Sequence, residues 1–118
     1  MQYLLMIYGD EAAMGSATPE QGKAMGEAYA RFTQDIVRSG HLKGGDKLKP
    51  SSTATTIRRG DGKSMTTDGP FAETREQLSG YYIVEAKDLD EALAIAGKIP
   101  FGSGAVEVRP IDSLARQY

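Results

Sequence analysis

The sequence has no cysteine among its 118 residues, and this absence excludes several kinds of chemistry. Without a thiol the chain cannot form a disulfide, a Cys-based zinc site or a covalent thiol intermediate. Histidine is almost as scarce: His41 stands alone, and one imidazole without thiolates does not make a zinc site. The spacings of a phosphate-binding loop and of a nucleophile elbow are absent too. The sequence therefore predicts no bound metal and no cofactor.

Long apolar runs and a surplus of one charge are also missing. No run approaches the roughly 20 apolar residues of a membrane helix, and residues 1–8 resemble a strand more than a leader peptide. The 14 basic and 16 acidic residues are mixed along the chain. This balance offers no electrostatic footprint for nucleic acid or anionic lipid. We expect a cytoplasmic protein that binds neither nucleic acid nor membrane.

The length of the chain predicts a single domain. Domains commonly hold about 100 to 200 residues, and a chain of this size buries about two thirds of its unfolded surface without a disulfide. The sequence shows no internal repeat and no low-complexity block. We therefore expect one domain over residues 1–118.

The N-terminal third predicts a strand, a loop and a helix. Residues 2–8 are apolar on both alternating faces, as in a strand of a covered sheet, and the small residues of 9–17 predict a loop. Residues 18–21 combine an N-cap threonine, a proline at the first helical position and a glutamine three residues after the cap. The apolar stripe of this helix is Met25, Ala28, Tyr29, Phe32 and Ile36. Gly40 marks its end.

The rest of the chain predicts a surface segment, a hairpin and a second strand–helix–strand unit. Residues 41–52 are expected to run extended over the surface, and turn residues 60–63 join strands at 53–59 and 64–67. Residues 68–71 force a break, and a strand follows at 79–86. Asp88 caps a helix, 105–109 form the last strand, and 111–118 predict a tail. The apolar stripe of this helix is Leu89, Ala92, Leu93 and Ala96.

These elements follow the order β-α-β-β-β-α-β, which predicts an α+β domain with a ferredoxin-like fold. Both helices of such a fold pack on one face of the sheet. A second copy of the chain is the commonest cover for the other face, so the sequence predicts a homodimer. The strand residues that exceed what one helical layer covers are Tyr3, Leu5, Ile7, Tyr81 and Ile83.

Residues 67–82 read TDGPFAETREQLSGYY and resemble the signature of the DGPF branch of the YCII-related family. Residues 3–10, 88–92 and 106–111 resemble that branch too, so the similarity covers nearly the whole chain. The resemblance implies a dimeric α/β-barrel built on a ferredoxin-like unit. It also implies an association with an extracytoplasmic-function sigma factor, because members of the branch are often encoded beside one.

The wider family includes proteins with a His–Asp pair in a cleft, proposed as acid–base enzymes, and a lyase that acts on chlorinated aromatic compounds. The family's histidine near the start of the first helix has no counterpart here, because residues 18–39 contain none. A histidine frequent before the last strand of the branch is replaced by the sequence Gly-Ser-Gly at 102–104. These departures argue against a His–Asp mechanism.

Two carboxylates are the candidate catalytic residues. Asp68 could act as a general base or orient a ligand; the alternative is an Asx turn, in which it binds nearby backbone amides. Glu73 lies three residues before Glu76, so a short helical turn would bring both carboxylates together for proton transfer or a divalent cation. The alternative is a solvated loop with an ion pair to Arg75. Phe71 is expected to anchor this segment in the core.

Four residues are candidates for ligand binding. Arg75 follows the signature, which the resemblance places beside the family's cleft. The hydroxyl of Tyr8 could line a pocket or pack at an interface. His41 supplies the chain's imidazole, which could bind a ligand, and its alternative role is a contact at the end of the first helix. Arg109 is expected on the face of the last strand opposite its valines, where it could bind an anion or pair with Glu107 or Asp112.

Two functions of different classes remain. In the first, the protein is a small-molecule-binding or regulatory accessory. In the alternative, it is a small acid–base enzyme of the lyase or hydrolase type, in which Asp68 and its neighbours act on a small organic substrate. The missing histidine favours the first.

Overall fold

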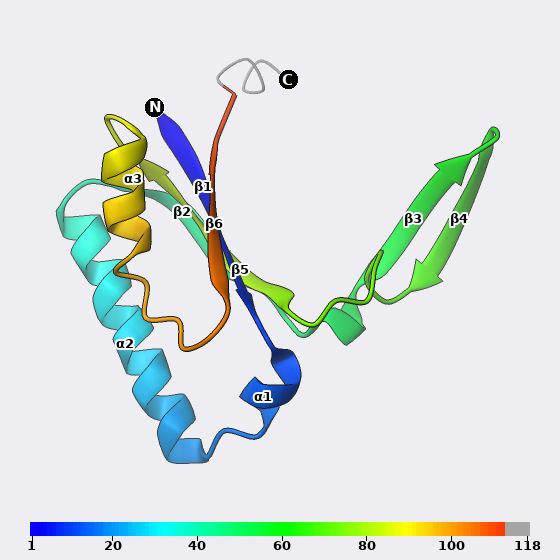
Figure 1. The fold of residues 1–118 in the computed structure, drawn as a ribbon, viewed down its shortest axis with the longest axis horizontal. Helices are drawn as coiled ribbons and strands as arrows, with labels where there is room; N and C mark the ends of the chain where they lie inside the picture. The colour runs from blue at the N-terminus through cyan, green and yellow to red at the C-terminus, as the bar shows by residue number, and fades with distance from the viewer. Residues whose placement is uncertain (113–118) are drawn as a thin grey trace.

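Four antiparallel strands form the central sheet of the computed structural model, which describes residues 1–112 (Figure 1). The strands are β1 (Gln2–Gly9), β2 (Leu42–Lys47), β5 (Gln77–Glu85) and β6 (Ala105–Pro110). Their order is β2-β5-β1-β6. This order, with helices connecting β1 to β2 and β5 to β6, confirms the predicted ferredoxin-like α+β fold. Residues 113–118, which belong to the predicted tail, lie outside the described residues.

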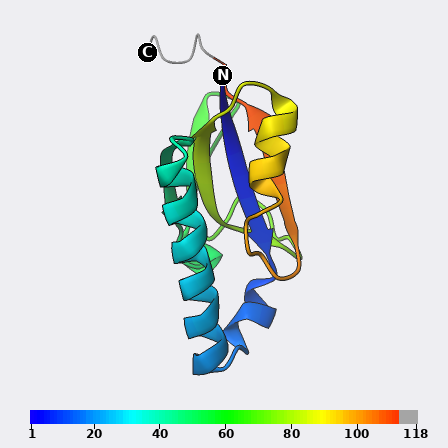
Figure 2. The ribbon, with the colours of Figure 1, turned by 90° about the vertical axis from the view of Figure 1, so that its left-hand side faces the viewer.

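Two helices, α2 (Pro19–Arg38) and α3 (Leu89–Ala96), cover one face of this sheet (Figures 1 and 2). The capping box that begins α2 is confirmed, because the Gln21 amide donates to Thr18 Oγ1 at 3.1 Å and the Gln21 side chain accepts from the Thr18 amide at 2.9 Å. Gly40 ends the helix with φ of +79°, and the next amide, of His41, donates to the Ile36 carbonyl. The predicted loop at 9–17 contains a short helix, α1 (Glu11–Gly15), capped by Asp10. None of the helices in the described part of the chain has the length and apolar character that crossing a membrane requires.

The hydrophobic core lies between the helices and the sheet. Alternate residues of β1 point into it, so Tyr3, Leu5 and Ile7 are buried under the helices. The prediction that these three exceed what the helices cover is wrong. The rest of the core consists of Phe32, Ile36, Val84, Ala86, Ala92, Ile95, Ala96 and Ile99. In α3, Ala92 and Ala96 of the predicted stripe are buried, whereas Leu89 and Leu93 are about half exposed and Ile95 faces the core in their place.

The edge strand β2 occupies part of the segment that was expected to run over the surface. Its close approach to β5 explains why the sequence did not resemble a strand. A Cβ on Gly45 would lie 2.7 Å from the Tyr81 carbonyl oxygen, and one on Gly80 would lie 2.9 Å from that of Asp46. Strand propensity penalises glycine, but at this bulged pairing only glycine fits.

The remaining strands, β3 (Thr55–Gly60) and β4 (Lys63–Asp68), confirm the predicted hairpin. Asp61 and Gly62 form its turn with positive φ angles of 51° and 74°. The hairpin does not join the central sheet but forms a two-stranded sheet of its own. We call residues 55–68 the arm. It stands away from the body, on the side of the sheet that the helices leave uncovered (Figures 1 and 2).

Candidate functional site

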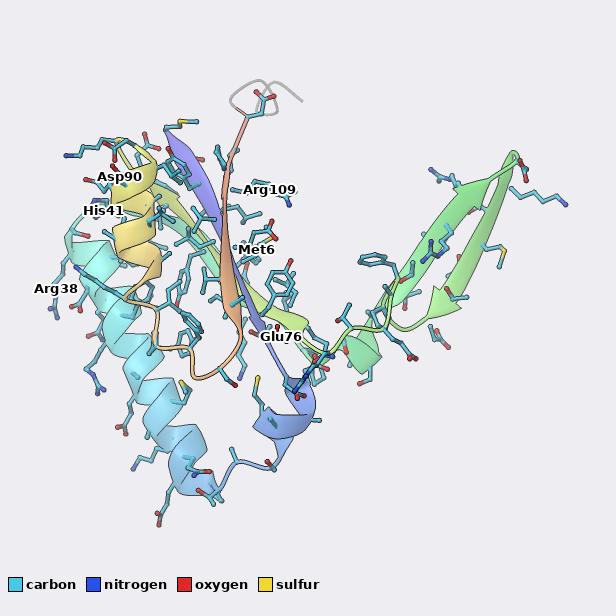
Figure 3. All side chains as sticks on the ribbon, in the orientation of Figure 1. Met6, Arg38, His41, Glu76, Asp90 and Arg109 are labelled. Carbon is cyan, nitrogen blue, oxygen red and sulfur yellow. The ribbon has the colours of Figure 1, made fainter. Side chains whose placement is uncertain are left out.

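The sheet face opposite the helices carries a band of half-buried apolar and aromatic side chains. Strand alternation places Leu4, Met6 and Tyr8 on this side, and the register pairs Leu4 with Ile83 and Met6 with Tyr81. Glu107 and Arg109 border the band, because Val106 and Val108 of the same strand pack on the core. We call these side chains the open face: Leu4, Met6, Tyr8, Tyr81, Ile83, Glu107 and Arg109. Figure 3 shows Met6 and Arg109 on this side, away from the helices.

Tyrosine hydroxyls supply the polar groups within the open face. Tyr81 donates a hydrogen bond to Asp46 Oδ2 at 2.7 Å, and this bond to the carboxylate raises the pKa of Tyr81. Among residues 1–112, the Tyr8 hydroxyl has only a weak contact, with the Met6 sulfur at 3.8 Å. It therefore keeps most of its hydrogen-bonding capacity for another group. Apolar surface with a few hydroxyls is suited to binding an organic molecule.

Arg109 lies on the open face as predicted. Its guanidinium pairs with Glu107, two residues earlier on the same strand. The pair is exposed, so it stabilises the fold by only about 0 to 1 kcal/mol. Arg109 can therefore exchange this partner for an anionic group at little cost.

A hollow of about 300 Å³ lies where the arm joins the body. We call it the arm-root pocket. Its lining residues are Ser51, Pro70, Ala72, Glu73, Thr74 and Gln77. Glu11 fixes Ser51 on one side of the pocket, because its carboxylate accepts hydrogen bonds from both the amide and the hydroxyl of Ser51 at 2.7 Å. On the other side, the Gln77 side chain accepts a hydrogen bond from the Glu11 amide at 3.0 Å and donates one to the Thr74 carbonyl at 2.6 Å.

Glu73 lies in this pocket, but the predicted helical turn that would pair it with Glu76 is wrong. Residues 71–76 contain no helix. The hydroxyl of Thr74 donates a hydrogen bond to the Glu76 carbonyl. This side-chain bond competes with the backbone hydrogen bonds of a helical turn, and the segment is irregular. Within residues 1–112 Arg75 has no carboxylate partner, contrary to the predicted ion pair. No three His, Asp or Glu side chains of that range gather closely enough to hold a metal ion.

Asp68 and Phe71 lie neither on the open face nor in the arm-root pocket. Asp68 ends β4 opposite Thr55, and its carboxylate has no hydrogen-bond or ion-pair partner among the described residues, so the predicted Asx turn is wrong. The backbone closes the turn instead, because the Gly69 amide donates to the Ala54 carbonyl at 2.6 Å. Phe71 was expected in the core, but it is 73% exposed.

His41 lies on the helical side of the sheet, away from the open face (Figure 3). Its backbone amide, rather than its ring, caps α2. The ring bridges two side chains, with Nδ1 2.7 Å from Ser39 Oγ and Nε2 3.2 Å from Glu91 Oε1. No local pattern indicates this pairing, because Glu91 is fifty residues away from His41 in the sequence. A hollow of about 550 Å³ between α2 and α3 is lined partly by His41.

The series Ser39, His41 and Glu91 has the connectivity of an acyl-transfer triad, but its surroundings do not suit that chemistry. Acyl transfer needs N–H donors aimed at the developing oxyanion. Ser39 caps the C-terminal end of α2, where the backbone carbonyl oxygens carry the negative end of the helix dipole. Glu91 Oε1 also accepts from the Lys87 amide at 3.2 Å, so it holds the start of α3. The three side chains therefore link the ends of two helices.

The structure distributes the predicted site residues over several places instead of one. Only two of them share a surface, the open face. The six residues lie as follows: Tyr8 and Arg109 on the open face, Glu73 in the arm-root pocket, Asp68 on the arm, Arg75 in the exposed segment after it, and His41 between the helices.

Comparison with known proteins gives two matches that cover almost the whole chain. The family model described as the YCII-related domain matches residues 1–114. An uncharacterized protein of Rhizobium meliloti strain 1021, R00369, is 33% identical over 114 residues, which cover 94% of this chain and 92% of the relative.

Proposed function

The chain belongs to the YCII-related domain family, and from that premise we propose that it acts as a cytoplasmic homodimer that binds a small organic molecule at the open face. The resemblance of residues 67–82 to the signature of the DGPF branch supports a place in that branch. An accessory role beside an extracytoplasmic-function sigma factor is the regulatory form of the same proposal. Its test is whether the two purified proteins form a complex whose mass is their sum.

The observation that carries the proposal is the composition of the open face. Ligand sites are concave and mostly apolar, with a few polar groups that fix orientation. The open face has the apolar surface, the hydroxyls of Tyr8 and Tyr81 and the guanidinium of Arg109. Packing two copies face to face would turn this surface into an enclosed space. Such a space suits a molecule with an apolar body and a group that accepts hydrogen bonds.

Binding is favoured over catalysis because the acid–base groups are apart. A general base must lie within hydrogen-bond reach of the proton that it removes and commonly needs a second group to orient it. His41 is paired with Glu91 on the helical side, and Asp68 is on the arm without a partner among the described residues. A dyad of these two residues would need them on one surface.

One observation supports the alternative of an acid–base enzyme. Glu73 lines the arm-root pocket beside the hydroxyls of Ser51 and Thr74. A carboxylate and hydroxyls around one hollow could move a proton on a small substrate. The same experiment tests both functions.

That experiment is a thermal-shift screen of metabolites against the wild type and three variants. A ligand at 100 times its Kd stabilises the folded protein by about 2.7 kcal/mol. For a ligand found with the wild type, we expect Tyr81→Phe to reduce the shift and Glu73→Gln and His41→Gln to retain it. Loss of the shift in Glu73→Gln alone would support the enzyme instead. Loss in His41→Gln with the response of Tyr81→Phe unchanged would contradict binding at the open face.

A further inference from the structure

We propose that the arm is a dimerisation arm, which packs against the second copy of the chain that covers the open face. This inference rests on the homodimer of the proposed function, and it adds a second contact region to that dimer. It concerns residues 55–68 together with Phe71, which follows them.

The arm receives little support from the rest of residues 1–112. It has two strands joined by six residue pairs, and no third strand of that range lies beside them. A two-stranded hairpin is at best marginally stable alone in water. Its large apolar side chains are mostly exposed: Ile57 to 61%, Met65 to 64% and Phe71 to 73%. Ile57 and Met65 point to opposite faces of the ribbon, because their cross-strand partners are Thr66 and Arg58, so each face exposes one large apolar side chain to water.

The arm stands on the same side of the sheet as the open face. The helices lie on one side of the sheet and the arm on the other, the side of the open face (Figures 1 and 2). A second copy that covers the open face would therefore lie beside the arm. In a twofold dimer both arms make the same contact, so each arm would gain a partner for its apolar side chains.

The chain exposes more surface than a compact monomer of its mass. A compact monomer of this mass exposes about 6,200 Å², whereas the chain exposes 8606 Å². The last six residues cannot supply more than about 1,000 Å² of the difference, even as an extended chain. An excess of about 1,400 Å² per chain remains, and twice that area falls in the range of obligate dimers. The radius of gyration, 16.3 Å, also exceeds the about 13.5 Å of a compact domain of this length.

A second copy fits the arm better than nucleic acid does. The arm has three cationic residues, Arg58, Arg59 and Lys63, but also two carboxylates, Asp61 and Asp68. Phosphate binding rests on a surplus of cations, and here the surplus is one. The guanidinium of Arg58 also donates a hydrogen bond to the Phe71 carbonyl, so one of the three cationic side chains already has a partner within the chain.

The test is the dimer dissociation constant of matched triple variants, measured by sedimentation velocity over a dilution series. The arm variant carries Ile57→Ser, Met65→Ser and Phe71→Ser. The control carries Met25→Ser, Val37→Ser and Leu93→Ser, three apolar residues exposed by 41 to 57% on the helices. If each of the three side chains contributes a little under 1 kcal/mol to the free energy of association, the arm variant should raise the dissociation constant about 100-fold. The control should stay within about 3-fold of the wild type.

Hydrogen exchange of the arm amides gives a second readout that does not depend on the variants. In the wild type these amides should exchange slowly at concentrations above the dissociation constant and fast below it. Two results would overturn the inference even though the wild type is dimeric. One is equal exchange of the arm amides at both concentrations, and the other is an unchanged dissociation constant in the arm variant. DNA retention that is lost in Arg58→Gln/Arg59→Gln, with the dimer unaffected by the arm variant, would also overturn it. A monomeric wild type would instead refute the dimer of the proposed function.

Discussion

At the scale of single residues, two glycines set how closely β2 approaches β5. A Cβ on Gly45 would lie 2.7 Å from the Tyr81 carbonyl oxygen and 2.9 Å from the Tyr82 ring. Backbone atoms of a central strand cannot move aside as the end of a flexible side chain can. The neighbouring Gly44 differs, because its Cβ would meet only the Ile83 side chain at 3.8 Å, an ordinary contact.

We therefore predict that Gly45→Ala lowers the free energy of unfolding by about 1 to 3 kcal/mol, as other overpacked substitutions do. Gly44→Ala is the matched control and should change it by less than about 0.5 kcal/mol. Urea unfolding followed by circular dichroism measures both. Equal losses in the two variants would show that glycine is needed here for strand flexibility and not for close approach.

Asp68 and Phe71 show what a motif predicts at this scale and what it leaves open. The break at residues 68–71 is present in the structure, with Gly69 at φ of +100°. The roles of the two side chains were predicted from the turn alone, and they depend on what surrounds them. In a single chain the carboxylate has no partner within residues 1–112 and the aromatic ring is exposed.

At the scale of elements, α2 has two unlike halves. Its C-terminal half packs Phe32 and Ile36 into the core, and the ring of Phe32 meets that of Tyr82 edge-on at 5.2 Å. Residues 19–27 are all exposed, so the first half of the helix extends past the sheet without burying a side chain. Isolated helical turns are marginal in water, so this half depends on its capping box.

This difference predicts unequal effects of changing the two ends. Thr18→Ala should reduce helical circular dichroism by fraying the first turns, with little change in the melting midpoint. Gly40→Ala forces alanine to a φ of +79° and should cost about 1 to 2 kcal/mol of global stability. Thermal melts with far-ultraviolet spectra at low temperature measure both. A large midpoint loss for Thr18→Ala would show that the exposed half has a partner.

The sequence predicted the elements with local signals and missed those that depend on distant contacts. The caps of α2 and α3, the hairpin turn and the two apolar strands were predicted, because each is determined by a few adjacent residues. β2 was missed because its glycines serve a contact with β5. The separation of the arm from the central sheet was missed because β2, and not the hairpin, occupies the place beside β5.

The site was predicted less well than the fold for a similar reason. Of the candidates, Arg109 was placed on the correct face by strand alternation, and its pairing with Glu107 was predicted as an alternative. The partners of other polar groups come from distant segments, as Asp46 does for Tyr81 and Glu91 for His41. One sequence contains no signal for such pairs, so the arm-root pocket could not be predicted.

At the scale of the whole molecule, two features point to the same assembly. The sheet has one face covered by helices and one face with half-buried apolar side chains, and the arm projects on the uncovered side. Each feature is costly for a lone chain, because both leave apolar surface in water. A second copy would cover both, and it would enclose the hydroxyls of Tyr8 and Tyr81 in the space between the sheets.

The homodimer is the central claim, and its molar mass in solution tests it most directly. Light scattering coupled to size-exclusion chromatography, at micromolar protein, should give about twice the chain mass of 12.7 kDa. Met6→Lys, which places a charge in the middle of the open face, should give the mass of one chain, and Val37→Lys on the outer side of α2 should remain dimeric. A wild-type mass of 12.7 kDa at that concentration would contradict the account.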